Sequence, residues 1–112
     1  MQISSVLEEG NYIIAIDGDV DASSSIRLDE ALAKAVEEGQ QHILIDCINL
    51  NYISSAGLGV FMSYIEELKE KNIRMVLFGL SDKVKNVFVV LGLDQLLNIK
   101  DTKDQARQQS HE

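Results

Sequence analysis

The first two apolar runs of the chain are short and contain the β-branched residues that strands favour. Residues 2–9 and 11–18 are therefore typical of two strands. Glu9, Gly10 and Asn11 lie between these runs, and such residues predict a hairpin turn.

Three later apolar runs also predict strands. Residues 42–48 are too apolar and too short for a surface helix, which indicates a central strand buried on both faces. Residues 73–79 predict another strand, and residues 96–99 predict a last short strand at the edge of the sheet.

Between these strands, apolar residues recur at the spacing of a helix. Residues 26–39 predict a helix that ends at Gly39, with a core face of Leu28, Ala31, Leu32, Ala35 and Val36. Residues 55–71 predict a second helix, with a core stripe of Leu58, Phe61, Met62, Ile65 and Leu68. A third helix is predicted after Ser81, a good N-cap, with a face of Val84, Val87, Phe88 and Leu91.

The predicted order is β-β-α-β-α-β-α-β, with a possible short helix after the last strand. Alternating strands and helices imply an α/β fold with a mixed sheet. We expect a sheet of four to five strands flanked by three to four helices. Residues 1–112 should form a single domain, of which residues 101–112 are a polar tail that is partly frayed or holds a short helix.

Composition narrows the class of protein. Hydrophobic residues make up 46% and charged residues 25% of the 112 residues, as in an ordinary globular domain. The formal net charge is -8, from 18 acids and 10 bases. This balance argues against nucleic-acid and anionic-membrane binders, which need clustered Lys or Arg. A basic protein partner is compatible with the charge.

Three features of the sequence bear on where the protein is located in the cell, and together they favour the cytoplasm. The single cysteine, Cys47, lies in an apolar run and is expected to be a buried, reduced thiol. The first residues lack the basic start and apolar core of a signal peptide. No apolar run approaches the roughly 18 residues that a membrane-spanning helix needs.

Catalytic and metal-binding motifs are not recognisable. His42 and His111 have no metal-ligand spacing with Cys47, so no zinc site is expected. Asp19 and Asp21 could contribute to a cation site, but a calcium loop needs more oxygen ligands, and capping the first helix is the favoured role. We expect no enzyme activity, no metal and no cofactor.

A serine pair, Ser54 and Ser55, falls where a predicted strand gives way to a helix. One interpretation is a helix N-cap. The other is an anion or phosphoryl site, because a helix N-terminus carries unpaired N–H groups and partial positive charge. Gly57, which has no side chain, could let another chain approach the backbone.

The segment YISSAGLGV, residues 52–60, resembles the phosphorylation-site signature of bacterial anti-sigma factor antagonists in the STAS-domain family. The usual family form is an aromatic and an apolar residue, then Asp-Ser-Ser/Thr/Ala-Gly-Leu-Gly. The resemblance extends along most of the chain. GDVDASSS (18–25) resembles the family's loop before the first helix, ILIDCINLNYISSAGL (43–58) its strand and phospho-loop, and VKNVFVVLGLDQLLNI (84–99) its third helix and final strand.

The resemblance implies a STAS fold and partner switching. The unmodified antagonist would bind an anti-sigma factor that is also a serine kinase, and so release a sigma factor. Phosphorylation would end the binding, and a serine phosphatase would reset the protein. The family resemblance also suggests a monomer when the protein is free.

Carried over by position, the family's acceptor serine falls on Ser55, followed by Ala56 and Gly57. The family's Asp falls on Ser54, which is a departure and makes Ser54 the second candidate acceptor. The alternative function is a constitutive STAS interaction module in a larger signalling or transport assembly, without phosphorylation. An enzyme with Ser55 as nucleophile is a third, disfavoured reading, because no partner triad is evident.

The expected docking surface combines two loops and the second helix. It includes Asp21, Ser23 and Ser24 of the first loop, and Ser54, Ser55, Ala56 and Gly57 of the second. Val60 and Tyr64 lie four residues apart and off the core stripe, which makes them a candidate exposed anchor. The alternative is that both pack against a neighbouring strand or helix.

Overall fold

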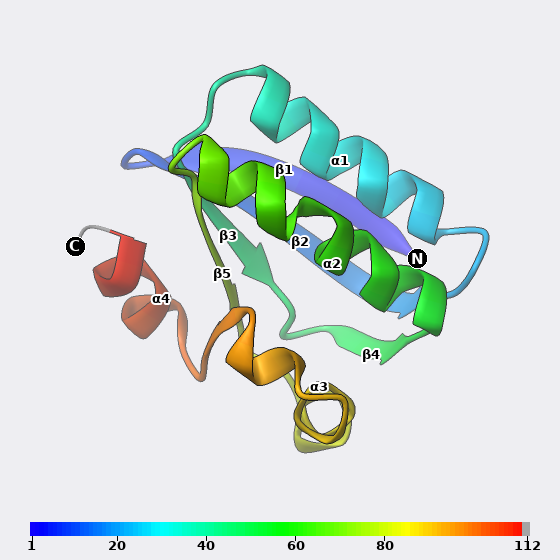
Figure 1. The fold of residues 1–112 in the computed structure, drawn as a ribbon. Helices are drawn as coiled ribbons and strands as arrows, with labels where there is room; N and C mark the ends of the chain where they lie inside the picture. The colour runs from blue at the N-terminus through cyan, green and yellow to red at the C-terminus, as the bar shows by residue number, and fades with distance from the viewer. Residues whose placement is uncertain (111–112) are drawn as a thin grey trace.

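A mixed sheet organises residues 1–110, the part of the chain that a computed structural model describes (Figure 1). Its strands are β1 (Gln2–Glu8), β2 (Asn11–Val20), β3 (His42–Asp46), β4 (Leu50–Ile53), β5 (Arg74–Phe78) and β6 (Asn98–Lys100). The helices are α1 (Ser25–Glu37), α2 (Ser55–Glu70), α3 (Asp82–Val90) and α4 (Lys103–Ser110), with a 3₁₀ turn, η1 (Leu93–Gln95). The α/β class and the order of the larger elements are confirmed.

The sheet has the order β1-β2-β3-β5-β6, and β4 also pairs with β2. The β1–β2 pair is antiparallel, whereas β2–β3, β2–β4, β3–β5 and β5–β6 are parallel. The described residues thus form six strands, one or two more than the four to five that we expected.

The first two strands form the predicted hairpin. Glu8 pairs with Asn11, and both intervening residues have positive φ, 51° for Glu9 and 83° for Gly10. Positive φ at both central positions defines a type I′ turn, whose twist matches that of the flanking strands.

The extra strand is β4, a segment in which the sequence predicts no strand. The predicted strand over residues 42–48 ends earlier, at Asp46, and the chain turns at Cys47, whose carbonyl accepts a 3.1 Å hydrogen bond from Leu50 N–H. After the turn the chain returns to β2, where Leu50 pairs with Gly18 and Ile53 pairs with Val20. The carboxyl ends of β2 and β4 therefore lie side by side.

Helices α1 and α2 lie next to each other on one face of the sheet (Figure 1). Leu28, Leu32 and Ala35 of α1 are buried there, as predicted, together with Leu58, Phe61 and Leu68 of α2. The predicted stripe of α2 is wrong at Met62, which is 37% exposed, while Tyr64 is buried in its place. The reason is that α2 packs against α1 as well as the sheet, which rotates its buried face toward Tyr64.

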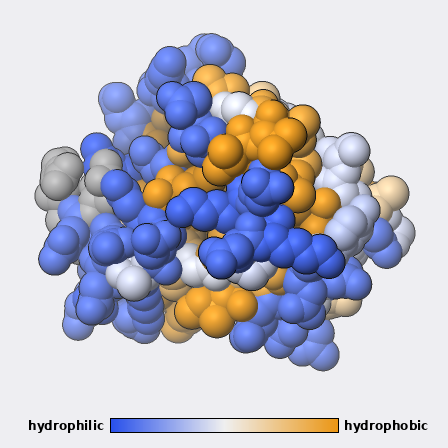
Figure 2. All heavy atoms as spheres, turned by 90° about the horizontal axis from the view of Figure 1, so that it is seen from below, coloured by the Kyte–Doolittle hydropathy of each residue, from blue (hydrophilic) through white to orange (hydrophobic). Residues whose placement is uncertain are grey.

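Helix α3 buries only part of its predicted apolar face. Val84 and Phe88 are buried, whereas Val87 and Leu91 are 36% and 58% exposed. The helix contacts mainly β4 and η1 at the rim of the sheet, so its outer side has no neighbour among the described residues. Figure 2 views the molecule from this lower side and shows apolar side chains grouped among polar ones.

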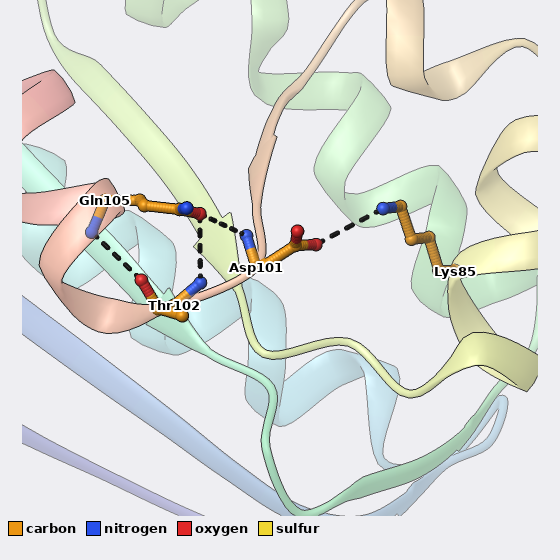
Figure 3. A network of polar contacts seen from close by, with 4 residues as sticks. All are labelled: Lys85, Asp101, Thr102 and Gln105. Atoms are coloured by element: carbon orange, nitrogen blue, oxygen red, sulfur yellow. Dashed lines mark hydrogen bonds and ion pairs between the residues drawn. The ribbon is translucent and has the colours of Figure 1, made fainter.

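The polar tail does contain the short helix that the sequence allowed, over Lys103–Ser110. Figure 3 shows how it starts: Thr102 Oγ1 accepts from Gln105 N–H (3.2 Å), and Gln105 Oε1 accepts from Asp101 N–H (3.1 Å) and Thr102 N–H (3.4 Å). This is a reciprocal capping arrangement. Lys85 of α3 also pairs with Asp101 at 3.3 Å. His111 lies outside the described residues.

Helix α4 covers the face of the sheet opposite α1 and α2. Ala106 is fully buried there in a second apolar cluster with Ile13, Leu44, Val76 and Phe78. The helix therefore belongs to the packed domain, because it removes these strand residues from water.

Candidate functional site

The two loops named by the sequence meet at one edge of the sheet. They are the first loop (residues 21–24), which follows β2, and the second loop (residues 54–56), which follows β4 and begins α2. Parallel strands bring their carboxyl ends to the same edge. A 2.8 Å hydrogen bond from Ser54 N–H to the carbonyl of Val20 joins the second loop to the last residue of β2, directly before the first loop.

The serine pair divides its roles. Ser54 is the N-cap of α2: its backbone is extended (φ -81°, ψ 170°), and its Oγ accepts a 3.2 Å hydrogen bond from Gly57 N–H. Ser55 is exposed in the first turn of α2, and its hydroxyl has no hydrogen-bond partner within residues 1–110. Each of the two interpretations of the pair therefore applies to a different serine. Ser54 caps the helix, and Ser55 offers a free hydroxyl at the positive end of the helix.

Gly57 serves internal packing rather than an open surface. It is buried, and a Cβ built on it would lie 2.7 Å from Ile53 Cγ1 and 2.8 Å from Val20 Cγ1. The suggestion that another chain approaches its backbone is therefore wrong, because the ends of β2 and β4 occupy that space. Gly59 is the glycine that is open, since it is exposed and a Cβ there would meet no atom within 4 Å.

Asp21 organises the first loop through hydrogen bonds to two serines. Its Oδ1 accepts from Ser24 N–H (2.9 Å), Ser23 Oγ (2.9 Å) and Ser24 Oγ (3.0 Å). The backbone bond from Ser24, followed by the bonds from the two hydroxyls, lowers the pKa of Asp21 from 3.8 to about 2. An exposed carboxylate is therefore held ionised and in one orientation beside the second loop.

The expected exposure of the Val60 and Tyr64 pair is wrong. Tyr64 is 8% exposed, and its hydroxyl donates a 3.2 Å hydrogen bond to the carbonyl of Asp29 in α1. Burial is the first cause that raises the pKa of Tyr64, to about 12. Val60 is half-buried against the main core. The alternative, that both pack against neighbouring elements, is the one that the structure supports.

Three other residues of α2 line its exposed side next to Ser55. Ala56 and Gly59 are exposed, and Met62 is 37% exposed. Ser55, Gly59 and Met62 follow each other at spacings of four and three residues, so they lie along one side of the helix. The spacing of these residues in the sequence carries this signal, but the predicted core stripe of the helix includes Met62.

Other chemistry is sparse in the described part of the chain. Cys47 is fully buried, and burial raises the pKa of its thiol, which keeps it protonated. Among residues 1–110, no group of three or more His, Cys, Asp or Glu side chains is placed to hold a metal ion. No helix in this range is long and apolar enough to cross a membrane.

Comparison with known proteins gives a consistent result. The STAS domain family matches residues 2–106. The anti-sigma-B factor antagonist of Listeria monocytogenes is 36% identical over 88 residues, which are 78% of this chain and 76% of that protein.

Solved structures agree with the fold. An anti-sigma factor antagonist from Mycobacterium paratuberculosis superposes with a TM-score of 0.87 at 18% identity, covering 99% of this chain and 96% of that one. The Bacillus cell fate determinant SpoIIAA, solved in its phosphorylated form, gives a TM-score of 0.72 at 19% identity, covering 96% of this chain and 98% of that one.

Proposed function

This chain belongs to the STAS-domain family of anti-sigma factor antagonists, and from that premise we propose that it acts by partner switching. In its unmodified form it binds an anti-sigma factor that is also a serine kinase, and the bound sigma factor is released. Phosphorylation of Ser55 ends the binding, and a serine phosphatase restores it. The protein is thus a regulated binding partner rather than an enzyme. Because a sigma factor acts on RNA polymerase, we place this exchange in the cytoplasm.

The observation that carries the proposal is the division of roles between the two serines. Ser54 uses its Oγ to cap α2, as the Asp usual in this family could also do. The departure from the family pattern therefore preserves the cap, and Ser55 keeps an exposed hydroxyl. A kinase can reach this hydroxyl without opening the helix, which favours Ser55 over Ser54 as the acceptor.

The charge of a phosphate explains why modification would weaken docking and why it would leave the domain folded. A phosphate adds about -1.5 to -2 charges at pH 7. At the start of α2 this charge faces the positive helix end, so the fold tolerates it. In a closed interface the same charge would have to lose its water, and it would lie in the loop pair that already contains the ionised Asp21. Phosphorylation should therefore weaken docking and leave the domain folded.

The proposed docking surface joins the first loop, the second loop and the open side of α2. Asp21, Ser23 and Ser24 supply fixed polar groups, and Asp21 suits a basic side chain of the partner. Ser55 and Ala56 lie at its centre, and Gly59 and Met62 extend it along α2. Met62 replaces the buried Tyr64 as the apolar anchor, since it is a large hydrophobic side chain that is exposed on that side.

The first experiment is the intact mass of the protein purified from its own cells, before and after phosphatase treatment. Peptide mapping over residues 51–62 would locate a phosphate, which adds about 80 Da. A phosphatase-sensitive adduct on Ser55 supports the switch. An adduct on Ser54 would contradict the division of roles between the serines.

A second candidate is a constitutive STAS module in a larger assembly. The observation that favours it is Ser54 in place of the family's Asp, which removes a negative charge beside the acceptor. Absence of any adduct over several growth conditions, together with a stable complex in pull-downs of the wild-type protein, would favour this candidate. If a Ser55→Glu variant captured less of the partner than the wild type did, while a Ser63→Glu control variant captured as much, the result would support the switch.

A further inference from the structure

Strand β1 forms an open edge of the sheet and lacks the usual protection of such edges. It pairs with β2 over all seven residues without a bulge, and no other strand among residues 1–110 pairs with its outer edge. Natural edge strands carry Lys, Pro or bulges that prevent pairing. β1 has none of these, and its one charge, Glu8, is paired with Lys103 of α4.

Two exposed apolar side chains lie on this strand. Val6 is 55% exposed and Leu7 is 59% exposed, and they point to opposite faces of the sheet because side chains alternate. The strand is also held at both ends, since Arg27 donates a 2.9 Å hydrogen bond to the carbonyl of Met1, and Glu8 pairs with Lys103 at 3.0 Å. The backbone of β1 is therefore held in an extended conformation that another strand can pair with.

The hairpin turn determines which backbone groups of β1 face outward. In the type I′ turn, Glu8 and Asn11 form a hydrogen-bonded pair, so the backbone groups of Glu8 point toward β2. In an antiparallel pair these directions alternate along the strand. The N–H and C=O groups that point away from β2 are therefore those of Ile3, Ser5 and Leu7.

We infer that this edge binds the β1 edge of a second copy of the chain in an antiparallel, two-fold symmetric pair centred on Ser5. Water satisfies these outward N–H and C=O groups in the free protein, and the polypeptide element that can pair with the whole row is another extended strand. Antiparallel pairing with Ser5 opposite Ser5 places Ile3 opposite Leu7 of the second copy, so all three outward residues pair at once. A shift of this register in either direction leaves some of them unpaired.

The side chains fit the same register. Leu7 gains Ile3 of the second copy as its cross-strand neighbour, and Val6 gains Ser4. Glu8 lies opposite Gln2, so no like charges face each other across the pair. A contact in which the same strand meets itself is the isologous interface that two-fold dimers require.

Electrostatic repulsion between the two chains opposes this contact, so the stability of the dimer should depend on ionic strength. Each copy carries a formal net charge of -8. Because salt screens such repulsion, the dimer should strengthen as ionic strength rises. The inferred dimer differs from the monomer that the family resemblance suggests, and its formation does not depend on phosphorylation of Ser55.

Analytical ultracentrifugation over a range of protein and salt concentrations tests the inference. We expect reversible association to a species of twice the chain mass, favoured by salt. Ser5→Lys should weaken it roughly tenfold or more, because like charges would stand directly opposite. Ser5→Glu should do the same. A mixture of the two variants should recover the dimer, because only at a two-fold axis does residue 5 face residue 5.

Controls separate this contact from loss of fold or from another surface. Val6→Lys tests the same edge without touching the hydrogen bond between Ser5 Oγ and Tyr12 OH. Hydrogen exchange should show protection of Ile3, Ser5 and Leu7 amides that grows with concentration. A wild-type monomer under all conditions would overturn the inference. So would a dimer unaffected by folded Ser5 and Val6 variants, which would point to the exposed side of α3.

Discussion

The Oγ of Ser54 accepts a 3.2 Å hydrogen bond from the backbone N–H of Gly57. This bond fixes the first turn of α2 against the ends of β2 and β4, because Gly57 itself is buried between Val20 and Ile53. The geometry leaves the following side chain, Ser55, outside the packed region. The order of the two serines, rather than the presence of either one, therefore determines which hydroxyl is accessible.

The cap gives a direct stability test. Ser54→Ala should lower the free energy of unfolding by about 1 kcal/mol, because Gly57 N–H loses its acceptor. Ser54→Asp should stay close to wild type, since a carboxylate can accept the same bond. Urea denaturation measures both. Equal loss in the Ala and Asp variants would contradict the view that the family's Asp and this serine have the same structural role.

Gly57 and Gly59 form a matched pair on one helix. Gly57→Ala should destabilise the protein by roughly 1–3 kcal/mol, because its Cβ would overlap Val20 and Ile53. Gly59→Ala should instead stabilise it, by up to about 1 kcal/mol, since the site is open and Ala is the better helix former. Thermal unfolding compares the two directly. A stabilised Gly57→Ala variant would show that the strand ends can move apart.

Local patterns in the sequence determine much of this fold. Gly10 is needed for the hairpin, and Leu58, Phe61 and Leu68 define α2 by spacing alone. The sequence does not predict β4, because its four residues bury only Leu50 and Ile53 and show no alternation of apolar and polar positions. Its pairing with β2 depends on the turn after β3, in which Asp46 Oδ1 accepts a 3.1 Å hydrogen bond from Ile48 N–H. An Asp in this position is a turn signal, but here it lies inside the apolar run that predicts the strand over residues 42–48.

The sequence predicts the two loops of the candidate site, but it does not predict which side of α2 is exposed beside them. The two loops follow from strand order, whereas the rotation of α2 depends on its contact with α1. That contact buries Tyr64 and exposes Met62. By contrast, the sequence does contain a local signal for the start of α4, because Thr102 and Gln105 have the spacing of a capping box.

Asp21 gives a pH-dependent prediction. Its pKa is about 2 in the folded protein, against an ordinary value of 3.8. The carboxylate therefore stabilises the folded state above about pH 4, and this contribution is lost as the pH falls toward 2. Carbon-detected NMR should give a midpoint near 2 in the wild type. A Ser23→Ala, Ser24→Ala double variant should titrate at higher pH, and an unchanged midpoint would contradict the hydrogen-bond explanation.

Helix α4 should matter for stability despite its polar sequence. Ala106→Asp should lower the free energy of unfolding by roughly 2 kcal/mol or more, because a carboxylate would enter the apolar cluster around Phe78. Gln108→Asp, at an exposed position on the same helix, is the control and should change little. Chemical denaturation with both variants decides whether the helix is packed in solution. Equal stability of the two would mean that it is detached.

The final prediction concerns what the fold does when Ser55 becomes negatively charged. Ser55→Asp should leave the far-UV circular dichroism of the domain unchanged, because the side chain is exposed and has no hydrogen bond to lose within the described residues. Its charge faces the positive end of α2, so stability should rise by about 0.3–1 kcal/mol at low salt. Ser63→Asp places the same charge in the middle of the helix, where the dipole gives little benefit. A loss of helix in the Ser55 variant alone would mean that phosphorylation acts by unfolding the start of α2, and the proposed local switch would then be wrong.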